Sequence, residues 1–208
     1  MKIAIIGATG KAGQKITQEA LLRKLDATAI VRDAKKLTFA IPTIEKDVLS
    51  LTVQDLAPFD VVINAFGAPF GQEEQHVVVG RHLISLLHGL TTRLIVVGGA
   101  GSLFVDSAKT LKVIDTPDFP AEFVATASNQ AKNLEDLQAS TINWTFISPS
   151  AFFDVDGPRT GSFILGKDNL LVNAAGTSYI SYADFAIAMI DEVQNTTHIK
   201  QRFTVGTK

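Results

Sequence analysis

The chain has 208 residues, of which 46% are hydrophobic and 19% are charged, and its formal net charge is -2. These values are typical of a globular protein and give no electrostatic reason to expect nucleic acid or an anionic membrane as a partner. The chain contains no cysteine, which excludes disulfides, thiolate nucleophiles and thiolate-bound metals. The sequence shows neither a signal peptide nor an apolar stretch of membrane-spanning length, so we expect one cytoplasmic domain over residues 1–208.

Expected strands and expected helices alternate along the chain. Residues 2–6 form a β-rich run, and residues 11–25 carry apolar side chains at helical spacing. Further strands are expected at residues 27–31, 41–44, 59–66, 93–97, 144–147 and 202–205, and further helices at residues 72–90, 129–139 and 182–193. Residues 163–172 are expected to form a small hairpin. This order predicts a single α/β domain with a doubly wound, mostly parallel Rossmann-type sheet, helices on both faces and a C-terminal hairpin.

Three glycines, Gly7, Gly10 and Gly13, follow the first expected strand and open the first expected helix. Their spacing, GxxGxxG, differs by one inserted position from the GxGxxG fingerprint of dinucleotide-binding proteins. The physical logic is the same: a tight turn, a close approach of backbone to a pyrophosphate, and close packing of helix on sheet. A purely structural turn is the alternative. A nucleoside-triphosphate P-loop is excluded, because Ile5 stands where its first glycine is needed and Ala12 where its hydroxyl is needed.

The end of the second expected strand bears on the choice of dinucleotide. An acidic residue there holds the ribose of NAD, whereas an arginine pairs with the extra phosphate of NADP. Arg32 is the first residue past the apolar run and Asp33 follows it, so we expect NADP(H), with NAD(H) left open by Asp33 and a solvated surface arginine as the alternative for Arg32. Asp47 and Val48 follow the third expected strand, where they could flank an adenine.

The chain resembles the atypical short-chain dehydrogenases/reductases called NAD(P)-binding or NmrA-like, and among them small NAD(P)H–flavin reductases akin to biliverdin reductase B. The similarity extends over nearly the whole chain and rests on six stretches: IAIIGATGKAG, VVINAFGAP, LIVVGGAGSL, AKNLEDLQ, WTFISPSAFF and GTSYISYADFAIAMIDE. The first stretch is common to very many dinucleotide-binding proteins, and the combination is more specific.

The resemblance implies roles for residues along the whole cofactor. It implies that Arg32 binds the 2′-phosphate and that Lys132 bonds the nicotinamide ribose. It further implies that the pyrophosphate is bound by Gly7, Thr9, Gly10, Lys11, Ala12 and Gly13, and the ribose beside the fourth strand by Ala65, Phe66 and Gly67. It implies that the nicotinamide lies beside Gly98, Gly99 and Ser102, and that its carboxamide is held by Ser148, Pro149 and Ser150.

One part of the wider family's pattern is missing. Ordinary members use Tyr-x-x-x-Lys, in which the tyrosine gives a proton to the carbonyl being reduced. Here Ser128 stands four residues before Lys132, and neither Tyr179 nor Tyr182 has a lysine four residues later. A flavin avoids this need, because the proton that accompanies the hydride can come from solvent. We therefore expect an enzyme that passes hydride to a flavin, as a substrate, or to a similar planar small molecule.

Aromatic residues could form the walls for such an acceptor. The candidates are Phe66, Pro69, Phe70, Phe104, Phe152 and Phe153, with Phe152 and Phe153 favoured, and Ser102 could bond a flavin carbonyl. Two alternatives remain open: a non-catalytic redox-sensing regulator and a quinone or isoflavone-type reductase. No metal site is expected, because a spacing of six residues does not bring His76, His82 and His88 onto one helix face. We expect a monomer or a small homo-oligomer.

Overall fold

The computed structural model describes the whole chain, Met1–Lys208. Its centre is an eight-stranded sheet in the order β3-β2-β1-β4-β5-β6-β10-β8, in which only β8 runs antiparallel to its neighbour. The strands of this sheet are β1 (Lys2–Ile6), β2 (Asp26–Val31), β3 (Thr43–Glu45), β4 (Val61–Asn64), β5 (Arg93–Val97), β6 (Asn143–Pro149), β8 (Ile164–Gly166) and β10 (Gln201–Gly206). The doubly wound, mostly parallel sheet that the sequence predicts is confirmed.

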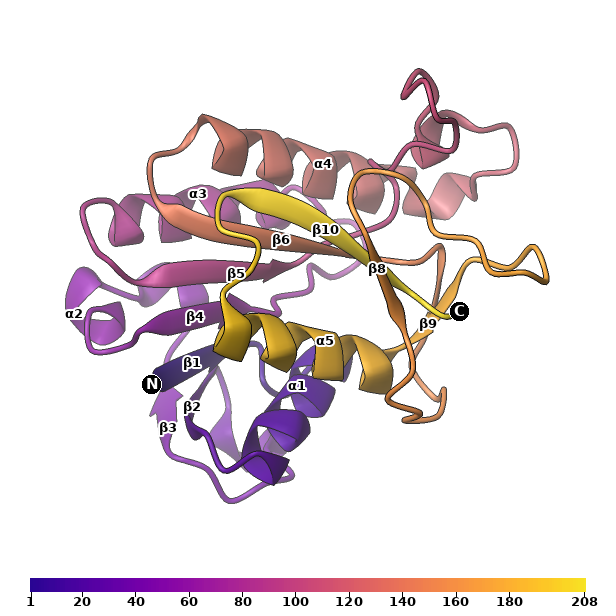
Figure 1. The fold of residues 1–208 in the computed structure, drawn as a ribbon. Helices are drawn as coiled ribbons and strands as arrows, with labels where there is room; N and C mark the ends of the chain where they lie inside the picture. Colours follow the sequence, from indigo (N-terminus) through magenta and orange to yellow (C-terminus); the bar gives the residue numbers. More distant parts are fainter.

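The helices lie on both faces of the sheet, as Figure 1 shows. The helices α1 (Lys11–Leu22) and α5 (Tyr182–Asn195) pack together on one face, and α3 (Gln75–Leu87) and α4 (Val124–Ala139) pack together on the other. A short helix, α2 (Val53–Leu56), and four 3-10 turns, η1 (Ala34–Lys36), η2 (Val48–Ser50), η3 (Val113–Asp115) and η4 (Ala121–Phe123), complete the connections. No helix is both long and apolar enough to cross a membrane.

Alternation along the buried strands divides the core in two. In β1, Ile3 and Ile5 belong to a cluster of 22 buried residues on the α1 and α5 side. Ala4 and Ile6 belong to a cluster of 17 buried residues on the α3 and α4 side. Because successive side chains point to opposite faces, a strand that is covered on both faces reads as an unbroken apolar run.

The expected C-terminal hairpin is wrong. Its first half, β8, pairs with β10 instead, with Leu165 opposite Val205. Its second half turns toward the segment after β5, where the Leu170 amide donates to the Phe104 carbonyl at 2.9 Å. The turn residues in the middle of this segment predict a local hairpin, but both halves of the segment form their hydrogen bonds with residues that are distant in the sequence.

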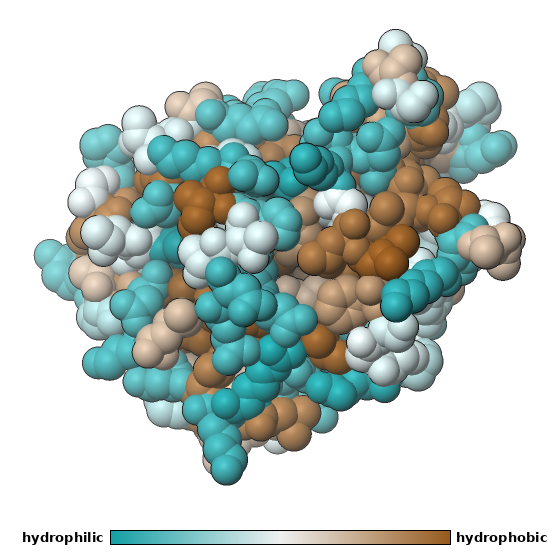
Figure 2. Space-filling model, in the orientation of Figure 1, coloured by the Kyte–Doolittle hydropathy of each residue, from teal (hydrophilic) through white to brown (hydrophobic).

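The structure contains two very short strands that the sequence did not predict. They are β7 (Phe152–Asp154) and β9 (Tyr179–Ser181), which form a separate parallel pair. Hydrophobic side chains gather on the surface over β8 and β9 (Figure 2). The exposed hydrophobic residues of the neighbouring segments are Phe152, Leu165 and Val172.

Candidate functional site: a cleft at the carboxyl ends of the strands

A cleft with a volume of about 560 Å³ has 25 lining residues. It opens at the carboxyl ends of β1, β2, β4 and β5, whose last residues or next neighbours contribute Ile6, Val31, Ala65 and Val97 to its lining. The chain leaves β1 toward β2 on one side and later returns to β4 on the other, so the cleft lies where the strand order reverses. Open α/β sheets bind their ligands at this point.

The glycine turn between β1 and α1 forms the floor of the cleft. Gly7 has φ +76°, and a Cβ there would lie 2.7 Å from the Ala65 carbonyl oxygen, so only glycine fits. A Cβ on Gly13 would overlap the Gly7 carbonyl oxygen, which explains the close packing of α1 against the turn. Gly10 is the N-cap of α1 and offers no side-chain acceptor to the first-turn N–H groups. The helix start is therefore free to bind an anion.

The cleft continues over the ends of β2 and β3. Arg32, Lys46, Asp47 and Val48 line this end. The Arg32 side chain is exposed and makes no ion pair or hydrogen bond within the chain. Asp33 does not line the cleft, since its carboxylate caps η1 by accepting from the Lys35 amide at 3.0 Å. The charge available to a ligand at this position is therefore that of the arginine.

The other end of the cleft is aromatic and carries no formal charge apart from a histidine. Gly98 at the end of β5, Phe153 from β7 and Tyr182 from α5 line it. The rings of Phe153 and Tyr182 are stacked, with centroids 3.7 Å apart and planes 5° from parallel. Burial raises the pKa of the Tyr182 phenol, so this hydroxyl stays protonated at neutral pH.

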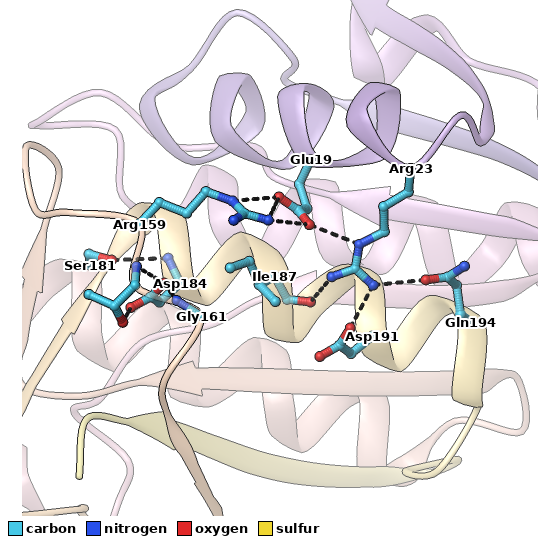
Figure 3. Close-up of polar contacts among 10 residues, drawn as sticks. Glu19, Arg23, Arg159, Gly161, Ser181, Asp184, Ile187, Asp191 and Gln194 are labelled. Carbon is cyan, nitrogen blue, oxygen red and sulfur yellow. Dashed lines mark hydrogen bonds and ion pairs between the residues drawn. The ribbon is translucent and has the colours of Figure 1, made fainter.

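A network of polar contacts holds the segment that follows β7, the strand that carries Phe153 (Figure 3). Beyond β7 the chain crosses α1 and α5, and Arg159 there donates to the buried Glu19 of α1 at 2.9 Å. The buried Asp184 of α5 accepts from the amides of Thr160 and Gly161, each at 2.8 Å. This segment, residues 155–163, is called the strap below. Because both helices fix the strap, the aromatic wall of the cleft is rigidly held.

Two candidate catalytic residues do not reach the cleft. Ser102 is buried, and its hydroxyl accepts from Arg202, which also pairs with Asp168. Lys132 lies on the exposed face of α4. Neither residue lines the cleft, so the structure lends no support to their assigned roles, which stay predictions.

The residues of α4 that do line the cleft are Thr126 and Gln130. They are four positions apart and so lie on one helix face, two positions before Ser128 and Lys132. A Cβ on Gly99 would overlap the Gln130 amide oxygen, so this amide lies against the end of β5. The residues of α4 that face the cleft thus stand two positions before the expected pair, and no register signal in the sequence separates the two faces.

Some of the other expected site residues line the cleft, and others lie outside it. The cleft lining includes Gly7, Thr9, Gly10, Lys11, Ala12, Arg32, Asp47, Val48, Ala65, Phe66, Gly67, Gly98 and Phe153. It does not include Gly13, Ser148, Pro149, Ser150 or Phe152. Ser148 is fully buried and its hydroxyl has no partner, whereas Ser150 donates to the Val205 carbonyl at 3.0 Å. Phe152 is 60% exposed and packs beside Tyr179.

Sequence reasoning missed several residues that line the cleft. His76 lies on α3 with its ring 6.0 Å from that of Phe66, and burial lowers its pKa. Phe123 meets Phe70 at the rim, with ring centroids 6.2 Å apart. Tyr182 was considered only as half of a Tyr-x-x-x-Lys pair. The hydrophobic spacing of the helices gave no sign that these side chains face a ligand cleft.

The donor groups of the cleft suit a dinucleotide. Its cations, Lys11, Arg32 and Lys46, line the part that runs from the α1 start to the ends of β2 and β3. Lys46 is already paired with Asp55 at 2.7 Å, which leaves Lys11 and Arg32 for phosphate groups. The glycine cradle, the uncapped helix start and the unpaired arginine therefore fit a pyrophosphate with a further phosphate on one ribose.

Comparison with known proteins agrees with this reading of the cleft. The family described as NAD(P)H-binding matches residues 7–195. The uncharacterized protein YwnB of Bacillus subtilis (strain 168) is 59% identical over 208 residues, covering 99% of this chain and 98% of that protein.

Two solved structures are similar over almost their entire length. A protein of Streptococcus pneumoniae TIGR4, described as a candidate NADH-flavin reductase, is 45% identical with a TM-score of 0.96, covering 100% of both chains. A candidate epimerase of Bacteroides thetaiotaomicron is 33% identical with a TM-score of 0.88, covering 99% of this chain and 96% of that one. The chain therefore belongs to the NAD(P)H-binding family of Rossmann-like, atypical short-chain dehydrogenase/reductase proteins.

Proposed function

We propose that this protein is an NADPH-dependent oxidoreductase that delivers hydride to a flavin or a similar planar acceptor. The observation that carries the proposal is the division of one cleft into a glycine-floored part that carries the charged side chains and an aromatic part without lysine, arginine, aspartate or glutamate. The name of the Streptococcus pneumoniae relative supports the acceptor class. That name specifies NADH, whereas the unpaired Arg32 favours NADPH, so both dinucleotides belong in the test.

The chain's own residues would hold the cofactor at three points. The first turn of α1 would donate backbone N–H groups to the pyrophosphate, and Lys11 would add a positive charge beside it. Arg32 would pair with the 2′-phosphate, and Val48 would pack against the adenine. When bound, the reduced nicotinamide supplies the hydride.

The aromatic end would hold the nicotinamide ring, and the acceptor would stack on the face of that ring that stays open. Phe153 and Tyr182 offer a flat wall that the strap keeps in place. Orientation of two stacked rings supplies much of the catalysis in hydride transfer between them. Burial raises the pKa of the Tyr182 phenol, which makes it a weaker proton donor than a free tyrosine, and lowers the pKa of the His76 imidazole, which favours its neutral form. The proton that completes flavin reduction would come from solvent.

The proposal is tested by the consumption of NADPH and NADH in the presence of different acceptors. FMN, FAD, riboflavin, a benzoquinone and biliverdin are each mixed with the purified protein, and loss of the reduced nicotinamide absorbance is followed without oxygen. We expect turnover with flavins above the protein-free rate. Faster turnover with the quinone would favour a quinone reductase. Binding of NADPH without turnover of any acceptor would refute the enzyme and favour a redox-sensing regulator.

The variant Gly10→Val tests whether the reaction uses this cleft. Gly10 has φ -77° and ψ 169°, which valine can adopt, and a Cβ there meets nothing nearer than the Gly7 carbonyl oxygen at 3.2 Å. The variant should therefore fold, while its side chain projects at the start of α1, where the pyrophosphate is proposed to bind. Circular dichroism checks the fold. Turnover that survives Gly10→Val would show that the reaction does not use this cleft.

A further inference from the structure

The cleft separates its charges along its length. Its formally charged lining residues, Lys11, Arg32, Lys46 and Asp47, lie beside the glycine turn and the ends of β2 and β3. The lining from β5, α4, β7 and α5 contains Gly98, Thr126, Gln130, Phe153 and Tyr182 and no lysine, arginine, aspartate or glutamate.

The strand order fixes which part of a dinucleotide would meet the uncharged end. With the pyrophosphate at α1 and the adenosine half over β2 and β3, the second nucleoside must extend across β4 toward β5 and β6. It then meets Gly98 and the stacked pair Phe153 and Tyr182. This step rests on the proposed function, because it assumes that the ligand is a nicotinamide dinucleotide.

The two redox forms of the nicotinamide differ in charge. The oxidised ring is a delocalised cation, and the reduced ring is neutral. The face of a phenol or benzene ring attracts cations, whereas a nearby ammonium would repel the oxidised ring. Lys132, the one lysine of α4, lies on its exposed face and not in the cleft. The uncharged end thus offers two aromatic rings and no opposing cation.

We propose that the Phe153 and Tyr182 pair makes this cleft select the oxidised cofactor, so that NADP⁺ binds more tightly than NADPH. Hydride donation converts the neutral nicotinamide into a cation, the acceptor gains the hydride with its two electrons, and the acceptor's further proton comes from solvent. A wall that stabilises the cation favours this direction of transfer. It also makes the released NADP⁺ an inhibitor that competes with NADPH.

The expected ratio of Kd values follows from the strength of the attraction between a cation and an aromatic ring. Attraction between a cation and an aromatic face ranges from about 0.5 kcal/mol at exposed sites to about 2 kcal/mol at desolvated ones. This range corresponds to a roughly two- to thirtyfold lower Kd for NADP⁺ than for NADPH. Tyr182 is half-buried, so we expect a value near the middle of the range.

Isothermal titration of the full-length protein measures this ratio directly. NADP⁺, NADPH and adenosine 2′,5′-bisphosphate are each titrated into the wild type and into Tyr182→Leu, Tyr182→Phe and Phe59→Leu. We expect Tyr182→Leu to bring the ratio of Kd values close to one and Tyr182→Phe to keep it. The adenosine bisphosphate, which lacks the nicotinamide, should bind all four proteins alike. Phe59→Leu is the matched control, since Phe59 is also half-buried but lies outside the cleft and packs against the cluster on the other face of the sheet.

The outcomes separate this inference from the proposed function. Equal or tighter binding of NADPH by the wild type would overturn the inference alone, and so would an unchanged ratio in Tyr182→Leu. If Tyr182→Leu fails to fold, the wild-type ratio and Tyr182→Phe still decide the question. Failure of both dinucleotides to bind would overturn the proposed function and the inference with it.

Discussion

Replacement of Arg32 by alanine should convert a preference for NADPH into indifference. Arg32 lines the cleft, is exposed, and has no partner of its own in the chain, so its removal frees no buried charge and costs no stability. A hydrogen bond between charged groups contributes about 1.5–3 kcal/mol. Since Arg32 is open to solvent, we take the lower half of this range, which predicts a Kd for NADPH that is roughly 13-fold to 45-fold higher. Binding of NADH should change less than about twofold.

Fluorescence titration of both dinucleotides at low and at high salt measures this effect. Lys35→Ala is the matched control, because it removes the same charge three residues away from a side chain that is exposed and outside the cleft. The loss in Arg32→Ala should shrink as salt screens the wild-type pair, whereas Lys35→Ala should bind like the wild type. Equal weakening of NADPH and NADH by Arg32→Ala would refute the assigned role.

Three further predictions concern protonation and stability. Because burial raises the pKa of Tyr182, the stability that the protonated phenol contributes is present below about pH 10 and is lost only as the pH rises through the folded-state pKa. The pH profiles of turnover from about pH 7 to about pH 9 should therefore be the same for the wild type and Tyr182→Phe. Asp184→Asn should lower the free energy of unfolding, measured in urea, by about 2–3 kcal/mol, since an amide cannot accept all the hydrogen bonds that the strap donates. The control Asp191→Asn changes an ion-paired side chain that is 41% exposed, and it should lower the free energy of unfolding by less than about 1 kcal/mol. Gly13→Ala should lower it by at least about 1–3 kcal/mol, because the new Cβ overlaps backbone, and Gly67→Ala should leave it unchanged, because a Cβ there meets nothing within 4 Å.

The fold and one half of the cleft could be predicted because their signals are local. The strand from Arg93 to Val97 was bounded correctly, since a strand buried on both faces is apolar throughout. The glycine turn, Arg32 and the Asp47–Val48 pair all follow directly after strands of a parallel sheet. Because such strands end at one edge, residues that follow them in the sequence meet in space.

The other half of the cleft depends on contacts that are distant in the sequence. Phe153 lines the cleft because β7 pairs with β9, and Arg159 beyond it reaches Glu19 across 140 positions. On α4, the choice between the Ser128 and Lys132 face and the Thr126 and Gln130 face follows from packing against α3. No short stretch of sequence encodes these relations, so the aromatic wall and the helix register required the structure.

A crystal structure of the protein with NADP⁺ tests the central claim most directly. The account predicts the 2′-phosphate beside Arg32, the pyrophosphate at the start of α1, and the nicotinamide ring with one face on the Phe153 and Tyr182 pair, its edge near Gly98 and its other face open to the mouth of the cleft. An open face would leave room for a planar acceptor. A nicotinamide turned out into solvent, or covered by protein on both faces, would contradict the account.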